Sequence, residues 1–497
     1  MNKANFNVLI GYPPIKSEKG IPLLSQNRQF QYFNNPTFIF PVVLGTAATM
    51  LKKEGYNILW RDFIAEGLSE DFFFEYLEFE KPNLIVFETK TPVIKLHWML
   101  INKLKERFPD MKIAICGDHV TFLPEETLQN SKVDYVIVGG YFDFAILDLC
   151  NSITKNKKVP EGIWHRKDGL IINKGRYEFK GKLDDAQFID RELTKNELYQ
   201  KEYNLKGRPF AYIMSARDCW WNRCRFCVWN HTLYPKGSFR SRTPENVFEE
   251  VKLLVDQYGI KEIFDDAGTI TVGPWLKKFC ELMIESGYNK KVMYSCNMRF
   301  GAVNEEEYKL MKKAGFRLLK FGLESGNQKT LDRLDKGIKI IDIEEGCKLA
   351  KKAKLLVHLT MMVGYNFETR EDANNTLKLA KKLMTKGYAD VLQSTVIVPY
   401  PGTPLYEEAL KENAFRIDPK DYERYDMSEP VLKTPDMTSK EIMDMCNNIY
   451  KIFLTPEYMF RRLIGIRSFG DVKFVLKGAK AVLGHLKDFS RGKDEAY

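Results

Sequence analysis

Short apolar runs alternate with helical stretches along the first third of this chain of 497 residues. Helical patterns at 44–54 and 97–107 are examples of the stretches between the runs. Alternation of this kind builds a parallel β-sheet covered by helices on both faces. The sequence therefore predicts an α/β protein whose first domain spans residues 1–150. Ligands of such sheets bind beyond the carboxyl ends of the strands. The expected strands are 7–11, 56–60, 83–88, 112–116 and 134–138.

A second alternating region follows, and we assign it residues 206–410. Six expected strands separated by helices fit a partial or full β/α barrel, whose active site forms at the carboxyl face. We interpret the intervening residues 151–205 as a connector that contains two short strands joined by a turn at 167–169. Residues 411–497 are expected to be helical and basic. The expected barrel strands are 211–214, 262–264, 292–296, 318–322, 357–363 and 391–398.

Three cysteines within nine residues, Cys219, Cys224 and Cys227, fall in the loop after the first barrel strand. Thiolates at this spacing converge on one soft metal centre. Four thiolates normally hold a four-iron cluster, so three would leave one iron open to bind a ligand. The aromatic Phe226 and three nearby tryptophans would keep such a centre dry.

The local residues leave two other interpretations open. His231 follows Cys227 by four positions, so the three cysteines and this histidine are compatible with a structural zinc site. Cys224 and Cys227 by themselves are compatible with a redox dithiol.

The composition is that of a soluble globular protein, with 44% hydrophobic and 29% charged residues. The other six cysteines are scattered, and no secretory signal precedes them. We therefore expect a cytoplasmic protein without a disulfide framework. The longest nearly apolar run, 38–51, is too short to span a bilayer.

Half of the formal charge of +10 lies in residues 458–497, which hold nine Lys/Arg against four Asp/Glu. Apolar residues recur there at helical spacing. Such a helix is compatible with peripheral contact to an anionic membrane, and we favour a helical cap packed on the core. We expect no nucleic acid partner because no recognisable motif accompanies the charge.

The order of the motifs resembles the cobalamin-binding radical SAM protein family over about residues 6–470. Each motif is weak alone, but in this order and at these intervals they are specific, and zinc becomes the minor interpretation. One departure is that four residues, instead of the usual three, separate Cys219 from Cys224. The motifs that carry the resemblance are the cysteine loop, 240–245, 264–266, 312–315, 322–326 and 399–405.

The resemblance implies that the three cysteines hold a [4Fe-4S] cluster and that S-adenosylmethionine (SAM) chelates its open iron. Reduction would then cleave SAM to methionine and a 5′-deoxyadenosyl radical. Glu324 and Ser325 match positions used near the nucleoside and methionine moieties, and Asp265 and Asp266 are expected to touch the methionine amine. The alternative for each acid is a helix N-cap.

The first 150 residues resemble the family's Rossmann-like cobalamin-binding domain. The expected cobalamin contacts are Asp62, Gly117, His119, Thr121 and Gly139. Asp118 stands where a second glycine is usual. In the lower-ligand pattern Asp-x-His-x-x-Gly, the histidine position is occupied by Ile64, which cannot ligate cobalt, so the lower face would be open or capped by another group. We expect His119 to form a hydrogen bond with the cofactor or the backbone rather than to ligate the cobalt. The alternative for the whole domain is that it is vestigial and binds no cobalamin.

The resemblance implies an enzyme that methylates an unactivated carbon of an apolar small molecule. Flavodoxin or ferredoxin is the expected electron donor. The chain's layout also resembles the anaerobic magnesium-protoporphyrin ester cyclase and hopanoid methylase group, so radical chemistry without methyl transfer is the alternative. A regulatory cluster in a cobalamin or redox sensor is a third hypothesis, and a sensor would not consume SAM continuously.

Overall fold

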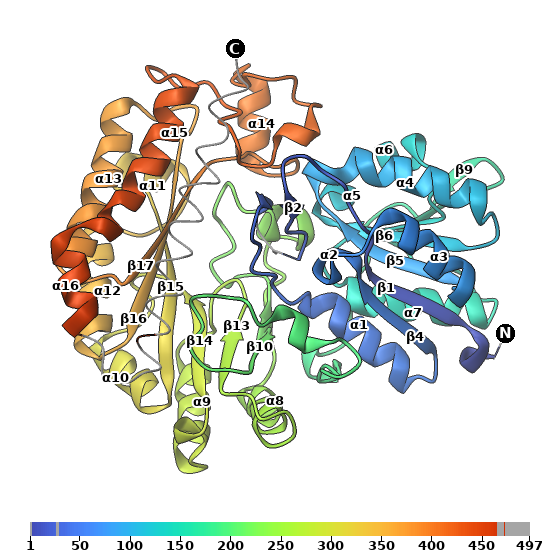
Figure 1. The fold of residues 1–497 in the computed structure, drawn as a ribbon, viewed down its shortest axis with the longest axis horizontal. Coiled ribbons are helices and arrows are strands. Elements are labelled where there is room, and N and C mark those ends of the chain that lie inside the picture. Colours follow the sequence, from blue (N-terminus) through green and yellow to red (C-terminus); the bar gives the residue numbers. More distant parts are fainter. Residues whose placement is uncertain (1, 26–28, 465–471, 473–497) are drawn as a thin grey trace.

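The computed structural model describes residues 2–25, 29–464 and 472, and it consists of two α/β units side by side (Figure 1). The predicted fold class is confirmed. Most of the basic carboxy-terminal segment, on which the predicted membrane contact depends, lies outside the described residues. Within the described residues, no helix is long and apolar enough to cross a membrane.

The first unit is built on a seven-stranded sheet in the order β4-β1-β5-β6-β7-β8-β9. Its first five strands are parallel, and β8 and β9 extend the sheet as an antiparallel hairpin. The hairpin turn contains Asp168 and Gly169 at positive φ, as the expected turn requires. The strands are β1 (Asn7–Tyr12), β4 (Asn57–Asp62), β5 (Leu84–Thr89), β6 (Lys112–Gly117), β7 (Tyr135–Ile137), β8 (Ile163–Lys167) and β9 (Leu170–Ile172).

The helices of the first unit separate its parallel strands, and the first and last of them pack against each other. The chain moves from β1 to β4 on one side and then returns to β5 on the other. The resulting crevice between β1 and β5 is the place where sheets of this topology bind ligands. The helices are α1 (Val42–Lys53), α2 (Phe63–Glu66), α3 (Glu70–Glu80), α4 (Ile94–Arg107), α5 (Asp118–Phe122), α6 (Pro124–Asn130) and α7 (Phe142–Thr154).

The second unit is a six-stranded, fully parallel sheet whose strand order follows the sequence. Within the described residues its first and last strands do not pair, so the barrel is partial. The structure confirms all six predicted strands, with ends shifted by up to two residues. They are β10 (Phe210–Ile213), β13 (Glu262–Asp265), β14 (Met293–Met298), β15 (Phe316–Glu324), β16 (Leu356–Val363) and β17 (Val391–Val396).

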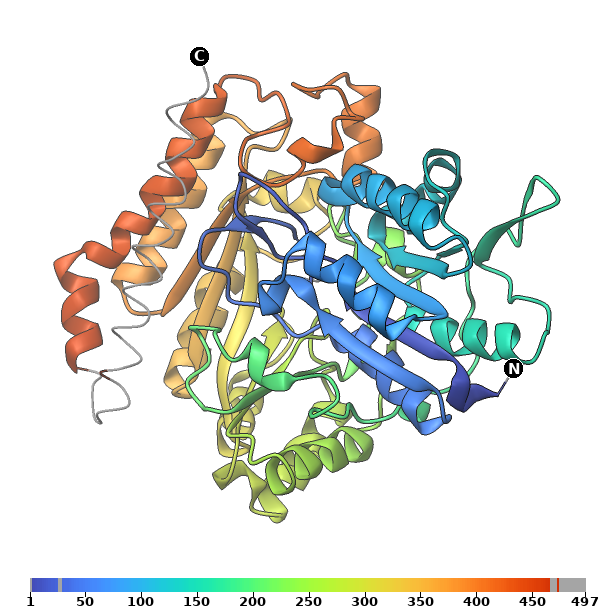
Figure 2. The same ribbon diagram turned by 45° about the vertical axis from the view of Figure 1, so that its right-hand side comes forward.

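Helices cover the outer side of the barrel, and local sequence explains where several of them begin. Thr243 caps the helix that starts at Pro244, and Thr369 with Asp372 forms a capping box. The helices α15 and α16 run along the side remote from the first unit in both views (Figure 2). The helices are α8 (Pro244–Asp256), α9 (Pro274–Glu285), α10 (Glu305–Lys313), α11 (Gln328–Arg333), α12 (Ile340–Lys352), α13 (Arg370–Thr385), α14 (Pro404–Lys411), α15 (Ser439–Asn448) and α16 (Pro456–Ile464).

Two short antiparallel pairs lie between the units. The segment that follows β1 carries β2 (Ile21–Pro22) and β3 (Tyr32–Phe33) and passes between the two sheets in Figure 1. The second pair, β11 (Ala216–Arg217) with β12 (Arg240–Ser241), closes the base of the cysteine loop.

Candidate functional site

The three cysteines of the loop after β11 line one open cavity at the carboxyl end of the barrel. The space inside the cavity, together with its opening to the solvent, has a volume of ≈ 1090 Å³. Cys219, Cys224 and Cys227 are all partly exposed, whereas the other six cysteines are buried. The backbone N–H of Cys227 donates to the Cys224 carbonyl at 3.1 Å, which makes a tight turn between these two residues. The three cysteines therefore share one cavity, and their role as cluster ligands stays a prediction.

Two glycines let neighbouring loops hold the cysteine loop closely. A Cβ atom on Gly268 would lie 2.6 Å from the Asp218 carbonyl oxygen and 2.7 Å from the Cys219 Cβ. Gly337 has a φ of +60°, and a Cβ there would lie 2.0 Å from the Trp221 ring. No side chain fits at either place. The sequence analysis did not identify either glycine. The sequence feature that could have revealed them is their position, since Gly268 directly follows Asp266-Ala267 and Gly337 directly follows Lys336.

Two tryptophans of the cysteine loop hold it to neighbouring segments through hydrogen bonds and also cover it with apolar surface. The indole N–H of Trp220 donates to the Ile270 carbonyl at 3.0 Å, and that of Trp221 donates to the Asp335 carbonyl at 2.8 Å. The Arg299 guanidinium lies 3.8 Å from the Trp221 ring centroid. These contacts connect the loop to the segments that follow three barrel strands.

The geometry does not favour zinc. The ring of His231 lies on the loop backbone, with Nε2 3.2 Å from the Cys224 carbonyl oxygen. Among the described residues, no three His, Cys, Asp or Glu side chains converge where one metal ion could sit. A zinc ion needs four ligands within about 2.3 Å, whereas a cluster takes one thiolate on each of several irons. Three soft donors facing one cavity fit a cluster with one open iron.

Two of the four expected SAM residues line this cavity. Glu324 ends β15 with a φ of +59°, and its carboxylate accepts from Lys336 Nζ at 2.7 Å. Burial opposes the charge on Lys336, but the Glu324 carboxylate and Cys224 outweigh it and raise the lysine pKa. Asp266 also lines the cavity and accepts from Asn297 Nδ2 at 2.9 Å. A carboxylate, an ammonium and an amide beside the cysteines fit the charged amino and carboxylate groups of SAM.

The other two expected SAM residues stand behind the cavity wall. Ser325 is fully buried, and its hydroxyl lies 3.2 Å from Thr376 Oγ1 and accepts from the Asn327 N–H. Asp265 accepts from the backbone N–H groups of Ser215 and Ala267 and from the Tyr294 hydroxyl. Their roles in binding SAM stay predictions, and the geometry gives both residues a part in holding strand ends.

The expected cobalamin residues of the first unit meet at the carboxyl edge of its sheet. Thr121 Oγ1 donates to the Gly117 carbonyl at 2.7 Å and accepts from the Gly139 N–H at 3.1 Å. Gly117 has a φ of +124°, and a Cβ there would lie 2.1 Å from the Thr89 carbonyl oxygen. Contacts between neighbouring strand ends therefore account for the presence of threonine and glycine at these positions.

His119 and Asp62 are buried at the same edge, each among protein partners. His119 Nδ1 lies 3.3 Å from Thr91 Oγ1, and its ring packs against Tyr422. Asp62 caps α2 through the Ala65 N–H and accepts from the Tyr199 hydroxyl at 2.9 Å. Burial raises the pKa of Asp62 to about 6. Cobalamin contacts by these residues stay predictions.

A buried ionic group lies at the crevice between β1 and β5. Lys90 Nζ is 3.6 Å from both the Glu88 and Asp118 carboxylates, and the Tyr12 hydroxyl donates to Glu88 at 2.8 Å. Glu88 lies in β5 and Asp118 directly follows β6, so the pairing of these two strands brings both carboxylates to one lysine.

The carboxyl edges of the two sheets face each other across the cysteine loop. Before the loop, Arg217 donates to the Asp143 carboxylate at the start of α7 at 2.8 Å, and both side chains are buried. After the loop, the Gly140 N–H donates to the Leu233 carbonyl at 2.8 Å, and the Tyr234 hydroxyl donates to the Gly140 carbonyl at 3.1 Å. The first unit thus holds the cysteine loop at both ends.

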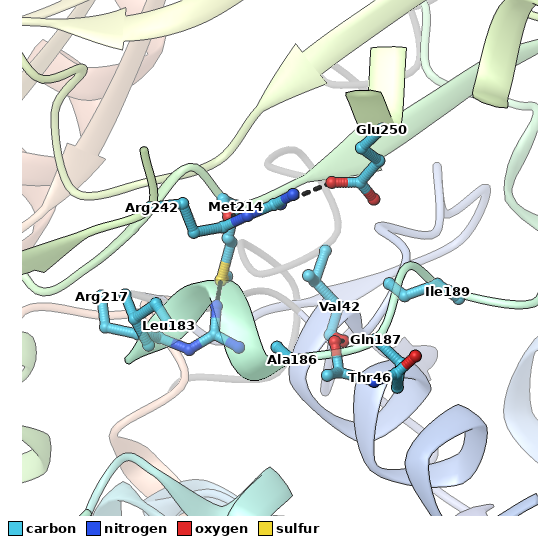
Figure 3. A pocket seen from close by; sticks show the side chains of 10 residues that line it. All are labelled: Val42, Thr46, Leu183, Ala186, Gln187, Ile189, Met214, Arg217, Arg242 and Glu250. Carbon is cyan, nitrogen blue, oxygen red and sulfur yellow. Dashed lines mark hydrogen bonds and ion pairs between the residues drawn. The ribbon is translucent and has the colours of Figure 1, made fainter. Parts of the chain in front are cut away.

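A small cavity of ≈ 370 Å³ lies beside this junction, between α1, the connector and the barrel. Figure 3 shows Arg217 below the Met214 sulfur, to which it donates at 3.1 Å, and Arg242 paired with Glu250. These charged groups are paired within the protein, so the cavity belongs to the interface between the units.

Comparison with known families decides what the cysteine loop is. Residues 213–380, which contain the loop and most of the barrel, match the radical SAM superfamily. These residues form a radical SAM domain. Enzymes of this superfamily use a [4Fe-4S] cluster and SAM, and the assignment of Cys219, Cys224 and Cys227 as the cluster ligands stays a prediction. The amino-terminal unit of the chain has the fold of cobalamin-binding domains.

Similarity to known proteins extends over most of the chain. The chain is 26% identical over 446 residues to an uncharacterized methyltransferase of Pyrococcus horikoshii, covering 88% of this chain and 93% of the relative. It is 24% identical over 425 residues to the anaerobic magnesium-protoporphyrin IX monomethyl ester cyclase of Cereibacter sphaeroides, covering 82% and 66%. The radical SAM methyltransferase TsrM of Kitasatospora setae, solved with cobalamin and a [4Fe-4S] cluster, has the same fold, with a TM-score of 0.69, 15% identity, and coverage of 98% and 100%.

Proposed function

We propose that this chain is a cobalamin-dependent radical SAM methyltransferase that methylates an unactivated carbon of a small molecule. One observation carries the proposal: the cysteine loop lies where the carboxyl edges of both sheets face each other, so a cofactor on the first sheet and one in the barrel share one space. The names of relatives support the same class, since they include the methyltransferase of Pyrococcus horikoshii and a hopanoid C-3 methylase of Methylococcus capsulatus.

The bound groups supply the chemistry that side chains cannot, namely radical generation at the cluster with SAM and methyl transfer from cobalamin. The residues of the chain orient these groups. Glu324 with Lys336 and Asp266 with Asn297 offer fixed carboxylates and donors beside the cysteines. Trp221, Phe226 and Trp229 cover the same cavity with apolar surface and limit the access of water.

The first unit offers no nitrogen ligand at the position of the usual histidine. Ile64 occupies that position in α2, and its neighbour Asp62 is fully engaged with Ala65 and Tyr199. We infer that cobalamin binds here without a nitrogen ligand from this motif. Cobalamin would supply methyl transfer at this sheet, and the residues of the motif would hold it without donating a nitrogen to the metal.

The electron donor belongs to the same proposal. Arg223 and Arg225 of the cysteine loop keep 54% and 41% of their side-chain surface exposed. Both arginines form ion pairs, with Asp335 at 2.9 Å and with Glu408 at 2.7 Å, so this mixed charged surface beside the loop is the place where we propose that a small redox protein such as flavodoxin or ferredoxin docks.

A second candidate, radical chemistry without methyl transfer, is favoured by the relationship to the ester cyclase of Cereibacter sphaeroides. The two functions differ in their products. A methyltransferase forms S-adenosylhomocysteine together with 5′-deoxyadenosine, whereas the alternative forms no S-adenosylhomocysteine.

The decisive experiment is anaerobic reconstitution with iron, sulfide and cobalamin, followed by SAM and a strong reductant. We expect both nucleoside products, and an absorption spectrum of cobalamin without a nitrogen lower ligand. Bound cobalamin with 5′-deoxyadenosine alone, when substrate candidates are present, would favour the second candidate. A protein that forms the cluster but retains no cobalamin would contradict the proposal.

A further inference from the structure

Asn230 holds the cysteine loop from the short helical turn Trp229–Leu233, which directly follows that loop. The residue is buried, with 2% of its surface exposed. Its amide oxygen accepts from the backbone N–H groups of Arg223 at 3.1 Å and Cys224 at 3.3 Å, and its amide nitrogen donates to the Cys227 carbonyl at 3.1 Å. These partners fix the orientation of the amide, because its oxygen can only accept and its nitrogen can only donate. One side chain therefore binds the backbone at both ends of the turn that carries two of the three cysteines.

The burial of this side chain has a stated cause. A buried amide is costly unless its donor and its acceptor are both engaged. Asn230 meets this condition only through the backbone of the cysteine loop, so its three bonds and the conformation of the loop depend on each other. A hydrophobic residue of the same size would be cheaper to bury, but it would leave the loop backbone unheld.

The turn that carries Asn230 is itself held on two sides. The Thr232 hydroxyl donates to the Pro401 carbonyl at 3.2 Å, at the carboxyl end of the barrel. The Leu233 carbonyl accepts from the Gly140 N–H of the first unit at 2.8 Å. The side-chain amide is therefore placed by two parts of the protein that are distant in sequence, and it is a fixed support for the cysteine loop.

Other N–H groups of the cysteine loop also bond to protein oxygens. That of Arg225 donates to the Leu334 carbonyl at 3.0 Å, and that of Cys227 donates to the Cys224 carbonyl at 3.1 Å. An N–H group that is engaged in this way is not available to the sulfur atoms of a cluster. Hydrogen bonds to those sulfurs are one of the factors that set the reduction potential of a cluster, because they stabilise the negative charge added on reduction.

We propose that Asn230 is a positioning residue for the cluster: it holds the turn between Cys224 and Cys227, and it withholds the N–H groups of Arg223 and Cys224 from the cluster sulfurs, which keeps the reduction potential low. This inference rests on the proposed function, because it takes the three cysteines as the cluster ligands. A low potential favours the transfer of an electron from the reduced cluster to SAM. Asn230 acts on the cluster through the backbone of the loop.

The test is a redox titration of the reconstituted protein without SAM, followed by electron paramagnetic resonance, together with iron content. Asn230→Leu keeps the size of the side chain and removes all three bonds, and Asn230→Ala removes them without any new contact. Asn230→Asp keeps the two accepting bonds. Asn196→Leu is the matched control, since Asn196 is also buried and donates to the Phe210 carbonyl at 3.0 Å, at the amino end of β10.

We expect Asn230→Leu and Asn230→Ala to favour the reduced cluster about tenfold, which is an upward shift of about 59 mV for one electron. Asn230→Asp should show no upward shift, because its N–H partners stay engaged and its charge opposes reduction. Asn196→Leu should have the wild-type potential. Loss of the cluster from a folded Asn230→Leu or Asn230→Ala protein, as judged by circular dichroism, would also support the proposal if Asn196→Leu retains its cluster.

Three results would overturn the inference: an unchanged potential in Asn230→Leu and Asn230→Ala with full clusters, an equal shift in Asn196→Leu, or an upward shift in Asn230→Asp. If the leucine variant does not fold, the alanine variant decides. A wild-type protein that forms no cluster would contradict the proposed function as well. An unchanged potential in variants that hold the cluster would contradict this inference alone.

Discussion

The two carboxyl edges of this protein use their motif residues in opposite ways. At the barrel edge, the three cysteines, Asp266 and Glu324 face an open cavity. At the edge of the first sheet, Gly117, Thr121 and Gly139 bond to one another, and Asp62 bonds to Ala65 and Tyr199. His119 is the exception, because its buried Nε2 atom makes no hydrogen bond and lies 3.6 Å from the Glu126 carboxylate. A residue that binds a ligand must expose a donor or acceptor, whereas a residue that shapes an edge has it satisfied internally. The difference indicates that the cluster site depends on individual side chains and that the first sheet contributes mainly its shape.

The largest expected effect concerns the cluster cysteines at the barrel edge. Replacing Cys219, Cys224 or Cys227 by Ala removes one of three thiolates, so the [4Fe-4S] cluster should be lost and 5′-deoxyadenosine should fall to background. Iron content and anaerobic turnover measure this. Cys280→Ala, in the buried face of α9, should retain the cluster. Retention of a full cluster by any of the three loop variants would contradict the assignment.

A second change tests whether the loop needs its close neighbour. The Cβ atom of Gly268→Ala would overlap the Asp218 carbonyl and Cys219, so the loop should shift and cluster occupancy should fall about tenfold. The fold should persist, as measured by circular dichroism. Gly237→Ala is the control, since its φ of +78° gives a strain of about 1 kcal/mol and no atom lies within 4 Å of the new Cβ. An unchanged iron content in Gly268→Ala would show that the loop can move without cost.

A third change tests how the two edges are joined. Asp143→Asn leaves buried Arg217 without its anionic partner, which should lower the free energy of unfolding by about 3–5 kcal/mol. Denaturant unfolding measures the loss. The double variant Asp143→Leu with Arg217→Met leaves no charge unpaired and should recover most of the stability. Its cluster should still give an altered electron paramagnetic resonance spectrum if the ion pair positions the loop.

The smallest effect concerns the first sheet. Asp62 has its pKa raised from 3.8 to about 6 by burial, so the folded state holds the proton more tightly than the unfolded state does. Its contribution to stability is therefore present at low pH and is lost as the pH rises from about 4 to about 6, by about 3 kcal/mol at most.

Asp62→Asn should flatten the dependence of unfolding free energy on pH in that window. Exposed Asp110→Asn, in a loop before β6, should leave the dependence unchanged. If Asp62→Asn instead reduced cobalamin retention and left the pH dependence intact, Asp62 would belong to the ligand, and the contrast between the two edges would weaken.

Strand positions and the cysteine loop were predictable because both are local properties. Apolar runs between helical patterns reveal a buried parallel strand wherever they occur, and all eleven expected strands are present. The ionic group of Glu88, Lys90 and Asp118 was not predictable, because it forms only where the ends of β5 and β6 lie side by side.

The sequence alone determined two α/β units, their order and a triplet of thiolates at the first strand of the second unit. Tertiary structure decided which acids face the cavity. Asp265 and Asp266 are neighbours in sequence, yet Asp265 ends β13 and is held by neighbouring strand ends, whereas Asp266 begins the following loop and lines the site. It also decided that the first unit holds the cysteine loop, because the contacts of Asp143 and Gly140 with residues 217–234 connect positions about 75–95 residues apart in the chain. Local patterns set which elements form, and only their packing sets which side chains remain open to a ligand.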